Sequence, residues 1–497
     1  MPPGQGPAPQ GGPYAPQQPW PPQAGGPPMP PPPPPSGDEN KGLKRAVIGV
    51  IVLAVLAVVG IGGVAIVKNM GSEALPTAAG GDGSKGQLLS ESDISSLLDG
   101  RSKALQGGDE DAFLAPFSGA ARTQQKKIFD NLRKVPLAEA EYRVTKQTGT
   151  GDNDYGDGAT VALDVAFVHK IKDVDVQPVS EWYRWVVKRK SKSEKPTITK
   201  VGGSPSAYGA KGYVYYPAPW DAYDNMFVKR QPHSVVIGDS KNTAQLSRVA
   251  PAIEKAAADD VAYWGANPPT TATTPKSFAV IVEPERKTYK TLYTSDQKDP
   301  GWDAGMSVAM PAYTGPYETL GDRPQFGGAR IKIDGSSGYF KGSDWQRGVA
   351  QISHHEMAHA MVQPLDKGDH SFLTGAKGGP RNWAVEGFAE YIAFHFDPKA
   401  GGDKMRYAFR GHEFDNKLPD VDSEFGSYPH SVGMDYSLSY LALKYIEKKG
   451  GEAAVLKFVA DHYQKPKKLD QQLQEATGQS GAAFESSWAK YVRSVVR

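Results

Sequence analysis

The sequence predicts an α+β protein in which short strands come before a long helical part. Apolar residues alternate with their neighbours in several runs before residue 335, as from Val161 to Phe167. After residue 343 the apolar residues instead recur at helical spacing, as at Val455 and Phe458. Gly- and Pro-containing stretches such as 202–205 separate these parts and are typical of domain boundaries.

The composition excludes several kinds of chemistry. The chain of 497 residues has no cysteine, so thiolate ligands, disulfides and thiol nucleophiles are excluded. A metal site must therefore use nitrogen and oxygen ligands. The formal net charge of +2 gives no reason to expect a nucleic-acid partner.

The N-terminal part is expected to lack a folded core. Residues 1–43 are largely Pro, Gly and Gln and are predicted to be a disordered tail with polyproline II character. The apolar run within 45–67 is long enough to cross a bilayer, and we expect a transmembrane helix there. A cleaved signal peptide is the competing interpretation, but it requires a shorter apolar run nearer the N-terminus. Residues 68–86, rich in Gly and Ala, are predicted to be a flexible linker.

Basic residues flank the predicted membrane helix unequally. Lys41, Lys44 and Arg45 lie on its N-terminal side, whereas Lys68 stands on the other. The positive-inside rule then predicts a cytoplasmic N-terminus. We therefore expect a single-pass protein of the cell membrane whose later domains are extracytoplasmic.

Residues 87–205 are predicted to form a small α+β module. Helical spacing over 88–133 comes first, with Ser90 and Ser92 as candidate N-caps. Strands are then predicted at 138–146, 160–169 and 180–190. Helices followed by a small antiparallel sheet are similar to NTF2-like or cystatin-like folds. His169 stands alone in a predicted strand and receives no functional role.

Residues 210–497 are predicted to form the second folded part. Strands are expected at 234–237, 278–282, 304–313 and 329–334, with a helix at 242–264 between the first two. Further helices are expected at about 343–363, 381–396, 436–449, 452–462, 469–476 and 482–496.

The helix at 343–363 contains the sequence His355-Glu356-Met357-Ala358-His359. Two histidines four residues apart project from one face of a helix, so both imidazoles can bind one metal ion. The glutamate beside the first histidine lies close enough to handle a proton of a metal-bound water. A third ligand from the segment 382–391 would leave a fourth position open, which is typical of a catalytic zinc site. The spacing alone does not exclude another divalent ion.

This pentapeptide and the segment from Trp383 to Tyr391, which reads W-x-x-E-G-x-A-E-Y, together resemble the gluzincin zinc metallopeptidases. The closest pattern is that of their peptidase MA-like members. The resemblance covers about residues 210–497 and is strongest between 343 and 450. It implies a thermolysin-like catalytic domain with a mixed sheet, active-site helices and a C-terminal helical part.

The resemblance also implies a role for each motif residue. One zinc ion per chain would be bound by His355, His359 and Glu386. Glu356 would act as general base and then as general acid. Glu390, one turn after Glu386, would accept the outer N–H of a ligand histidine.

An oxyanion donor and a substrate-binding strand are further expectations from the resemblance. Family members carry a tyrosine at the start of a later helix, where Tyr436 stands in this chain, with His430 and Tyr440 as alternatives. A plain packing role for Tyr436 stays open. The segment Gly327–Arg330 is the candidate for an edge strand that pairs with extended substrate, although an internal strand fits the same residues.

These observations favour a membrane-anchored, extracytoplasmic zinc metallopeptidase that acts on peptides or proteins. Gluzincin aminopeptidases carry a Gly-x-Met-Glu-Asn segment whose glutamate binds the free amine of the substrate. No such segment precedes Trp345, so endopeptidase action is favoured. Two alternatives stay open: a catalytically silent zinc-bearing envelope protein that binds or scaffolds, and a zinc hydrolase of a non-peptide amide. The presence of Glu356 argues against the first, because a pure binding site needs no base.

Overall fold

The computed structural model describes most of the chain after residue 87. The described ranges are 88–147, 159–204, 215–266, 268–293, 303–313, 317–318, 325–366, 380–419, 431–464 and 468–496. The predicted tail, membrane helix and linker lie outside them. Within those ranges no helix is both long enough and apolar enough to cross a membrane.

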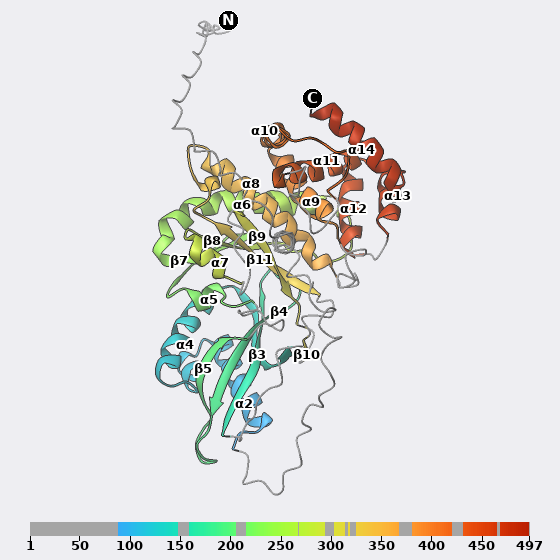
Figure 1. Ribbon diagram of the computed structural model, residues 1–497. Helices are drawn as coiled ribbons and strands as arrows, with labels where there is room; N and C mark the ends of the chain where they lie inside the picture. Colours follow the sequence, from blue (N-terminus) through green and yellow to red (C-terminus); the bar gives the residue numbers. More distant parts are fainter. Residues whose placement is uncertain are drawn as a thin grey trace, which may run out of the picture. The chain divides into compact units, whose positions relative to one another are not determined.

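Residues 88–204 combine helices with a four-stranded antiparallel sheet (Figure 1). The side chain of Ser90 accepts a hydrogen bond from Asp93 N and caps the first helix, as predicted. The sheet order is β1-β3-β4-β5, and β5 was not expected from the sequence. The elements are α2 (Glu91–Gly107), α3 (Glu110–Leu114), α4 (Gly119–Leu132), β1 (Leu137–Val144), β2 (Lys146–Gln147), β3 (Thr160–Ile171), β4 (Val179–Lys188) and β5 (Thr197–Gly203).

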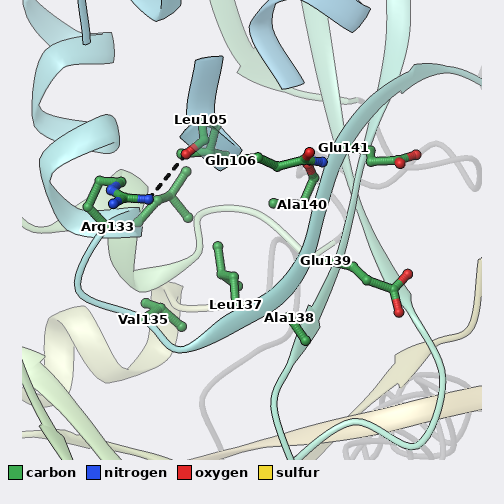
Figure 2. Close-up of a pocket in the computed structure, with 10 residues that line it drawn as sticks. Leu105, Gln106, Arg133, Val135, Leu137, Ala138, Glu139, Ala140 and Glu141 are labelled. Atoms are coloured by element: carbon green, nitrogen blue, oxygen red, sulfur yellow. Dashed lines mark hydrogen bonds between the residues drawn. The ribbon is translucent and has the colours of Figure 1, made fainter. Parts of the chain in front are cut away.

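A pocket of about 320 Å³ lies in this module between α2, the end of α4 and β1 (Figure 2). Its polar side chains are engaged by nearby backbone: Arg133 donates to Leu105 O at 3.4 Å, and Gln106 donates to Ala140 O at 2.9 Å. The carboxylates of Glu139 and Glu141 extend away from these two side chains. The polar groups of the lining residues therefore do not point toward a common position where they could bind a ligand or catalyse a reaction.

The larger sheet has five strands in the order β6-β7-β8-β11-β9. Strands β7, β8 and β11 are parallel, and the two edge strands are antiparallel to their neighbours. The segment Gly327–Arg330 belongs to β11, a strand that lies between β8 and β9, so its prediction as an edge strand was wrong and it is part of an internal strand; the edge is β9. The bounds are β6 (Met226–Arg230), β7 (Ser234–Asp239), β8 (Phe278–Glu283), β9 (Gly305–Pro311) and β11 (Phe326–Asp334), and a short β10 (Tyr317–Glu318) pairs with β2.

Both faces of the larger sheet are buried, which explains the continuous apolar run Phe278-Ala279-Val280-Ile281-Val282. One face, with Val280 and Ile331, packs against the helices α6 (Thr243–Ala266) and α8 (Trp345–Val362). The opposite face, with Ile281 and Val308, joins the apolar core of residues 88–204. The N-terminal module thus covers the face of the sheet that the helices leave open.

A buried ion pair joins the module to strand β11 of this sheet. Arg330 of β11 donates to both carboxylate oxygens of Asp175, at 2.6 and 2.9 Å, and both side chains are fully buried. The same guanidinium lies 3.1 Å from His169 Nε2. Backbone N–H groups of Val176 and Gln177 donate to Gly327 O. His169, which received no role from the sequence, therefore lies in the contact between module and sheet.

The helices after the sheet form a connected group (Figure 1). The helix α11 begins four residues before its predicted start because Ser431 caps it by accepting from Met434 N. The bounds are α9 (Asn382–Phe396), α10 (Pro398–Ala408), α11 (Val432–Gly450), α12 (Glu452–Gln464), α13 (Leu469–Thr477) and α14 (Gly481–Val495). Shorter elements are α5 (Pro219–Ala222), α7 (Arg286–Thr291) and the 3-10 turns η1 (Ser240–Asn242), η2 (Gly338–Phe340) and η3 (Gln363–Leu365).

We predict that Arg330→Ala destabilises the whole protein strongly. The substitution leaves the carboxylate of Asp175 buried without its cation, which costs about 3–5 kcal/mol in the free energy of unfolding. Urea unfolding of the full chain measures this cost. The double variant Arg330→Met with Asp175→Asn removes both charges and should lose clearly less, and Arg410→Ala at an exposed site should change little. Equal losses for the single and double variants would contradict the prediction.

Candidate active site

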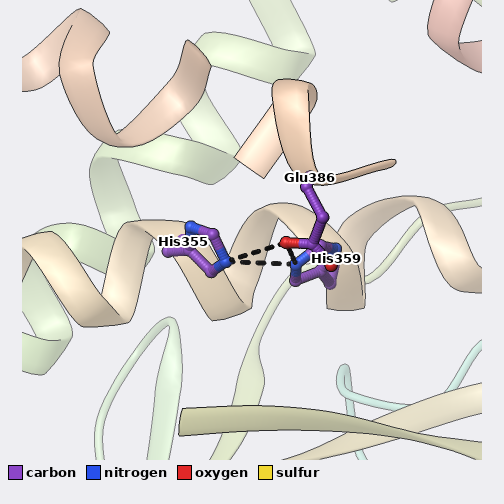
Figure 3. Close-up of side chains that lie close together, drawn as sticks. All are labelled: His355, His359 and Glu386. Atoms are coloured by element: carbon purple, nitrogen blue, oxygen red, sulfur yellow. Dashed lines mark hydrogen bonds and ion pairs between the residues drawn. The ribbon is translucent and has the colours of Figure 1, made fainter. Parts of the chain in front are cut away.

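Three side chains predicted as metal ligands lie together between α8 and α9 (Figure 3). His355 and His359 project from the same face of α8, and their Nε2 atoms are 3.3 Å apart. Glu386 extends toward them from the facing helix α9. The apolar sides of the two helices pack together through residues such as Met357 and Ala389. The cluster therefore sits on rigid elements and not on loops.

The spacing of the ligand atoms fits a tetrahedral metal ion. Glu386 Oε2 lies 3.4 Å from each of the two Nε2 atoms. A zinc ion with bonds of about 2.0–2.1 Å and tetrahedral angles separates its ligand atoms by about 3.3 Å. This oxygen is buried and makes no hydrogen bond of good geometry within the described residues. The three residues could therefore hold a metal ion.

Glu390 fixes the orientation of the first histidine. Its Oε1 atom lies 3.2 Å from Nδ1 of His355, so a ring proton is held on Nδ1 and Nε2 is the nitrogen that faces Glu386. Burial alone would raise the pKa of Glu390, but the charge of Lys404 and the hydrogen bond from His355 outweigh burial and hold that pKa at about 2. Glu390 is therefore ionised and can accept the ring N–H.

Lys404 is a member of the site that the sequence did not indicate. Its Nζ atom lies 2.7 Å from Glu390 Oε1 and 5.1 Å from the ring centroid of Tyr436. It comes from α10, a helix that was not predicted, and a single lysine on an amphipathic helix carries no motif. Burial would lower the pKa of Lys404, but the charge of Glu390 raises it, so the ammonium form is retained.

Glu356 lies on the side of α8 that faces the edge strand β9. A Cβ atom built on Gly305 would fall 2.6 Å from Glu356 Oε1, so the backbone of β9 is in direct contact with this carboxylate. Burial raises the pKa of Glu356 and outweighs the lowering effect of the neighbouring His355 and His359. A buried carboxylate with a raised pKa beside a metal-binding cluster is suited to proton transfer.

Tyr436 is the alternative among the three proposed oxyanion donors that lies at the cluster. Its ring centroid is 5.9 Å from that of His355. Burial raises the pKa of its phenol well above the usual value, and the charge of Glu386 adds to this, so the hydroxyl keeps its proton and can donate. Tyr440 instead packs edge-on against Phe394, with ring centroids 5.2 Å apart. His430 lies outside the described residues.

The remaining described histidines have other contacts. Nδ1 of His354 lies 2.7 Å from Asp260 Oδ1, on the buried side of α8 toward α6. Nε2 of His462 accepts from the backbone N–H of Arg381 and so supports the start of α9. None of these contacts leads to the metal-binding cluster.

We predict that removing Glu390 weakens zinc binding. In Glu390→Ala, His355 loses the acceptor that fixes its tautomer, and zinc affinity should fall about 10- to 100-fold. Lys404→Met keeps the carboxylate but frees its orientation, so a smaller loss in the same direction is expected. Competition with a chromogenic chelator measures both affinities. The exposed variant Lys449→Met is the matched control, and undiminished affinity in Glu390→Ala would show that this contact does not matter.

Comparison with known proteins adds a distant structural similarity. No protein-family model and no curated protein matches the chain. Among solved structures, an M1 zinc metallopeptidase from Deinococcus radiodurans matches 73% of this chain and 94% of that chain, with 10% sequence identity and a TM-score of 0.29. Similarity at this level carries no argument about the activity of this chain. The three ligand atoms must be interpreted from their own geometry.

Proposed function

We propose that the protein is a zinc-dependent peptidase that cuts within peptide chains. The observation that carries the proposal is the triangle of ligand atoms from His355, His359 and Glu386, with sides of 3.3, 3.4 and 3.4 Å. Two neutral imidazoles and one carboxylate are a ligand set of catalytic zinc sites. The buried Glu356 beside this triangle supplies the group that a purely structural site would not need.

The chemistry divides between the ion and the side chains. A zinc ion held there would supply Lewis acidity, which polarises a carbonyl and lowers the pKa of water. Glu356 takes the proton of the attacking water and then delivers it to the nitrogen of the leaving amine. Its raised pKa suits the first step, because a carboxylate of low pKa would be too weak a base to take the proton of water.

Tyr436 is proposed to stabilise the negative charge on the carbonyl oxygen. Its phenol stays protonated and lies beside Glu386 and His355, so it can donate to an oxygen that approaches the ligand triangle. Lys404, 5.1 Å from the centre of the tyrosine ring, holds this ring and Glu390 in one arrangement.

The edge strand β9 is proposed to bind the substrate main chain. Edge strands carry unpaired backbone groups that an extended peptide can use. β9 reads Gly305-Met306-Ser307-Val308-Ala309-Met310-Pro311 and has no acidic side chain that could bind a free amine. This composition supports cleavage within a chain over removal of single N-terminal residues.

We also propose that the enzyme is anchored in the cell membrane by the apolar run within 45–67, with residues after 68 outside the cytoplasm. The support for this part is the length of the run and the excess of Lys and Arg before it. Substrates would then be peptides or proteins of the extracytoplasmic space.

The test uses the full chain in detergent, loaded with zinc, on a mixed peptide library read by mass spectrometry. The parent should produce internal cuts. Glu356→Gln should bind zinc equally well but lose at least about a hundredfold in rate, because the proton acceptor is gone. A chelator should abolish cleavage and added zinc should restore it.

The matched control is Glu413→Gln, the same change at an exposed position, which should leave the rate unaltered. If the parent binds one zinc ion per chain but cuts no peptide, the proposal fails and a binding role takes its place. Release of single N-terminal residues would overturn the endopeptidase part alone.

We predict further that Gly305→Ala inactivates the enzyme without removing its metal. The added methyl group would meet Glu356 Oε1 and displace the base, and a misplacement of about 1 Å can cost about a hundredfold in rate. Zinc affinity should stay at the parent level. Gly202→Ala, where nothing lies within 4 Å of the new Cβ, is the control. Full activity in Gly305→Ala would show that the contact with β9 does not position Glu356.

A further inference from the structure

We propose that Gln363 ends the part of β9 that substrate can use, so that a bound peptide pairs with the strand at Gly305 and not at Ser307. Gln363 is thus a specificity-determining residue that limits how many substrate residues are bound on one side of the cleaved bond. This inference rests on the proposed function.

Gln363 follows His359 by one helical turn, so His355, His359 and Gln363 lie in a row along α8 and η3. Its side-chain amide makes two hydrogen bonds to one residue of β9. Nε2 donates to the backbone carbonyl of Ser307 at 3.1 Å, and Oε1 accepts from the Ser307 hydroxyl at 3.0 Å. The amide therefore bonds to β9 where the backbone of a neighbouring strand would.

The hydrogen bonds between β9 and β11 show which backbone groups of β9 point toward β11 and which remain for another partner. Asp334 N donates to Ala304 O at 2.8 Å, so residue 304 faces β11. Because successive residues of a strand alternate, Gly305 and Ser307 direct their N–H and C=O groups away from β11. Gly305 is partly exposed, whereas β9 is buried from Met306 onward. Of these two outward-facing positions, Ser307 already has a partner for its carbonyl and Gly305 lies beside Glu356.

A peptide would gain little by displacing this amide. Gln363 and Ser307 are both buried, with 7% and 6% of their surface exposed. Pairing with Ser307 O would replace the hydrogen bond from Gln363 Nε2, and moving the amide would also break its bond with the Ser307 hydroxyl and leave the amide buried. A buried polar group without a partner is unfavourable. The substrate main chain therefore stops short of Ser307.

The test measures binding of peptide hydroxamates to the full, zinc-loaded chain by calorimetry. The hydroxamate chelates zinc, so it fixes which residue stands at the metal. Two series of one to four alanines extend to either side of the chelating group. In the parent, affinity should rise with length in one series and should not change with length in the other; the second is called the flat side. In Gln363→Ala the flat side should gain about three- to tenfold, the effect of one added hydrogen bond.

Two variants separate the hydrogen bond from the space that the side chain fills. Gln363→Met keeps the volume and should keep the flat side flat. Ser307→Ala keeps the backbone carbonyl bonded to the amide and should behave like the parent. The shortest hydroxamate reports whether the zinc site is intact in each variant.

Affinity that rises equally on both sides in the parent would overturn the inference, as would a Gln363→Ala variant in which the flat side gains nothing. The proposed function fails by a different result, the absence of peptide cleavage by the parent. Because binding and not turnover is measured, an inactive parent would still show whether Gln363 limits the bound length.

Discussion

The contact between α9 and α11 at Gly387 sets the distances on which the site depends. A Cβ atom at this position would lie 2.6 Å from the backbone oxygen of Ser439, so any side chain there would push α11 away. Gly387 directly follows Glu386, and Tyr436 comes one turn before Ser439. The close approach of the two backbones therefore brings the phenol of α11 to the carboxylate of α9. α9 also packs against α8. The absence of a side chain at Gly387 therefore allows α9 to pack closely against α11 while α9 holds its place against α8.

The carboxylates of the site give it an excess of negative charge. Glu356, Glu386 and Glu390 are buried carboxylates within a small volume, and Lys404 compensates one of them. Burying the two remaining negative charges without a partner would be costly. A divalent cation between His355 and His359 would neutralise them, which explains why so many acidic groups can be kept away from water here.

The parts of the site that the sequence predicted are those that lie within one helix. The spacing of His355 and His359 on α8, and of Glu386 and Glu390 on α9, is a property of the helix itself, so residue numbers suffice to place these side chains. The bounds of α9 were also predicted to within one residue, because the start and end of a helix depend on local sequence.

The parts that the sequence could not predict depend on contacts between distant segments. The runs 305–311 and 326–334 are both short and apolar, and only strand pairing decides which is the edge. Lys404 reaches Glu390 from α10, whose two central glycines, Gly401 and Gly402, weaken the helical pattern. The contact between Gln363 and Ser307 joins residues far apart in the sequence and belongs to no motif, so only the fold brings them together.

The burial of both faces of the five-stranded sheet has a consequence for how the protein is made. The ribosome delivers residues 88–204 before any strand between Met226 and Asp334, so the residues that cover one face of the sheet have already been synthesised when those strands emerge. The module can then act as an intramolecular template on which the sheet assembles. The module bears no catalytic group. Substitutions that destabilise it would nevertheless impair folding of the sheet and, with it, formation of the metal-binding site.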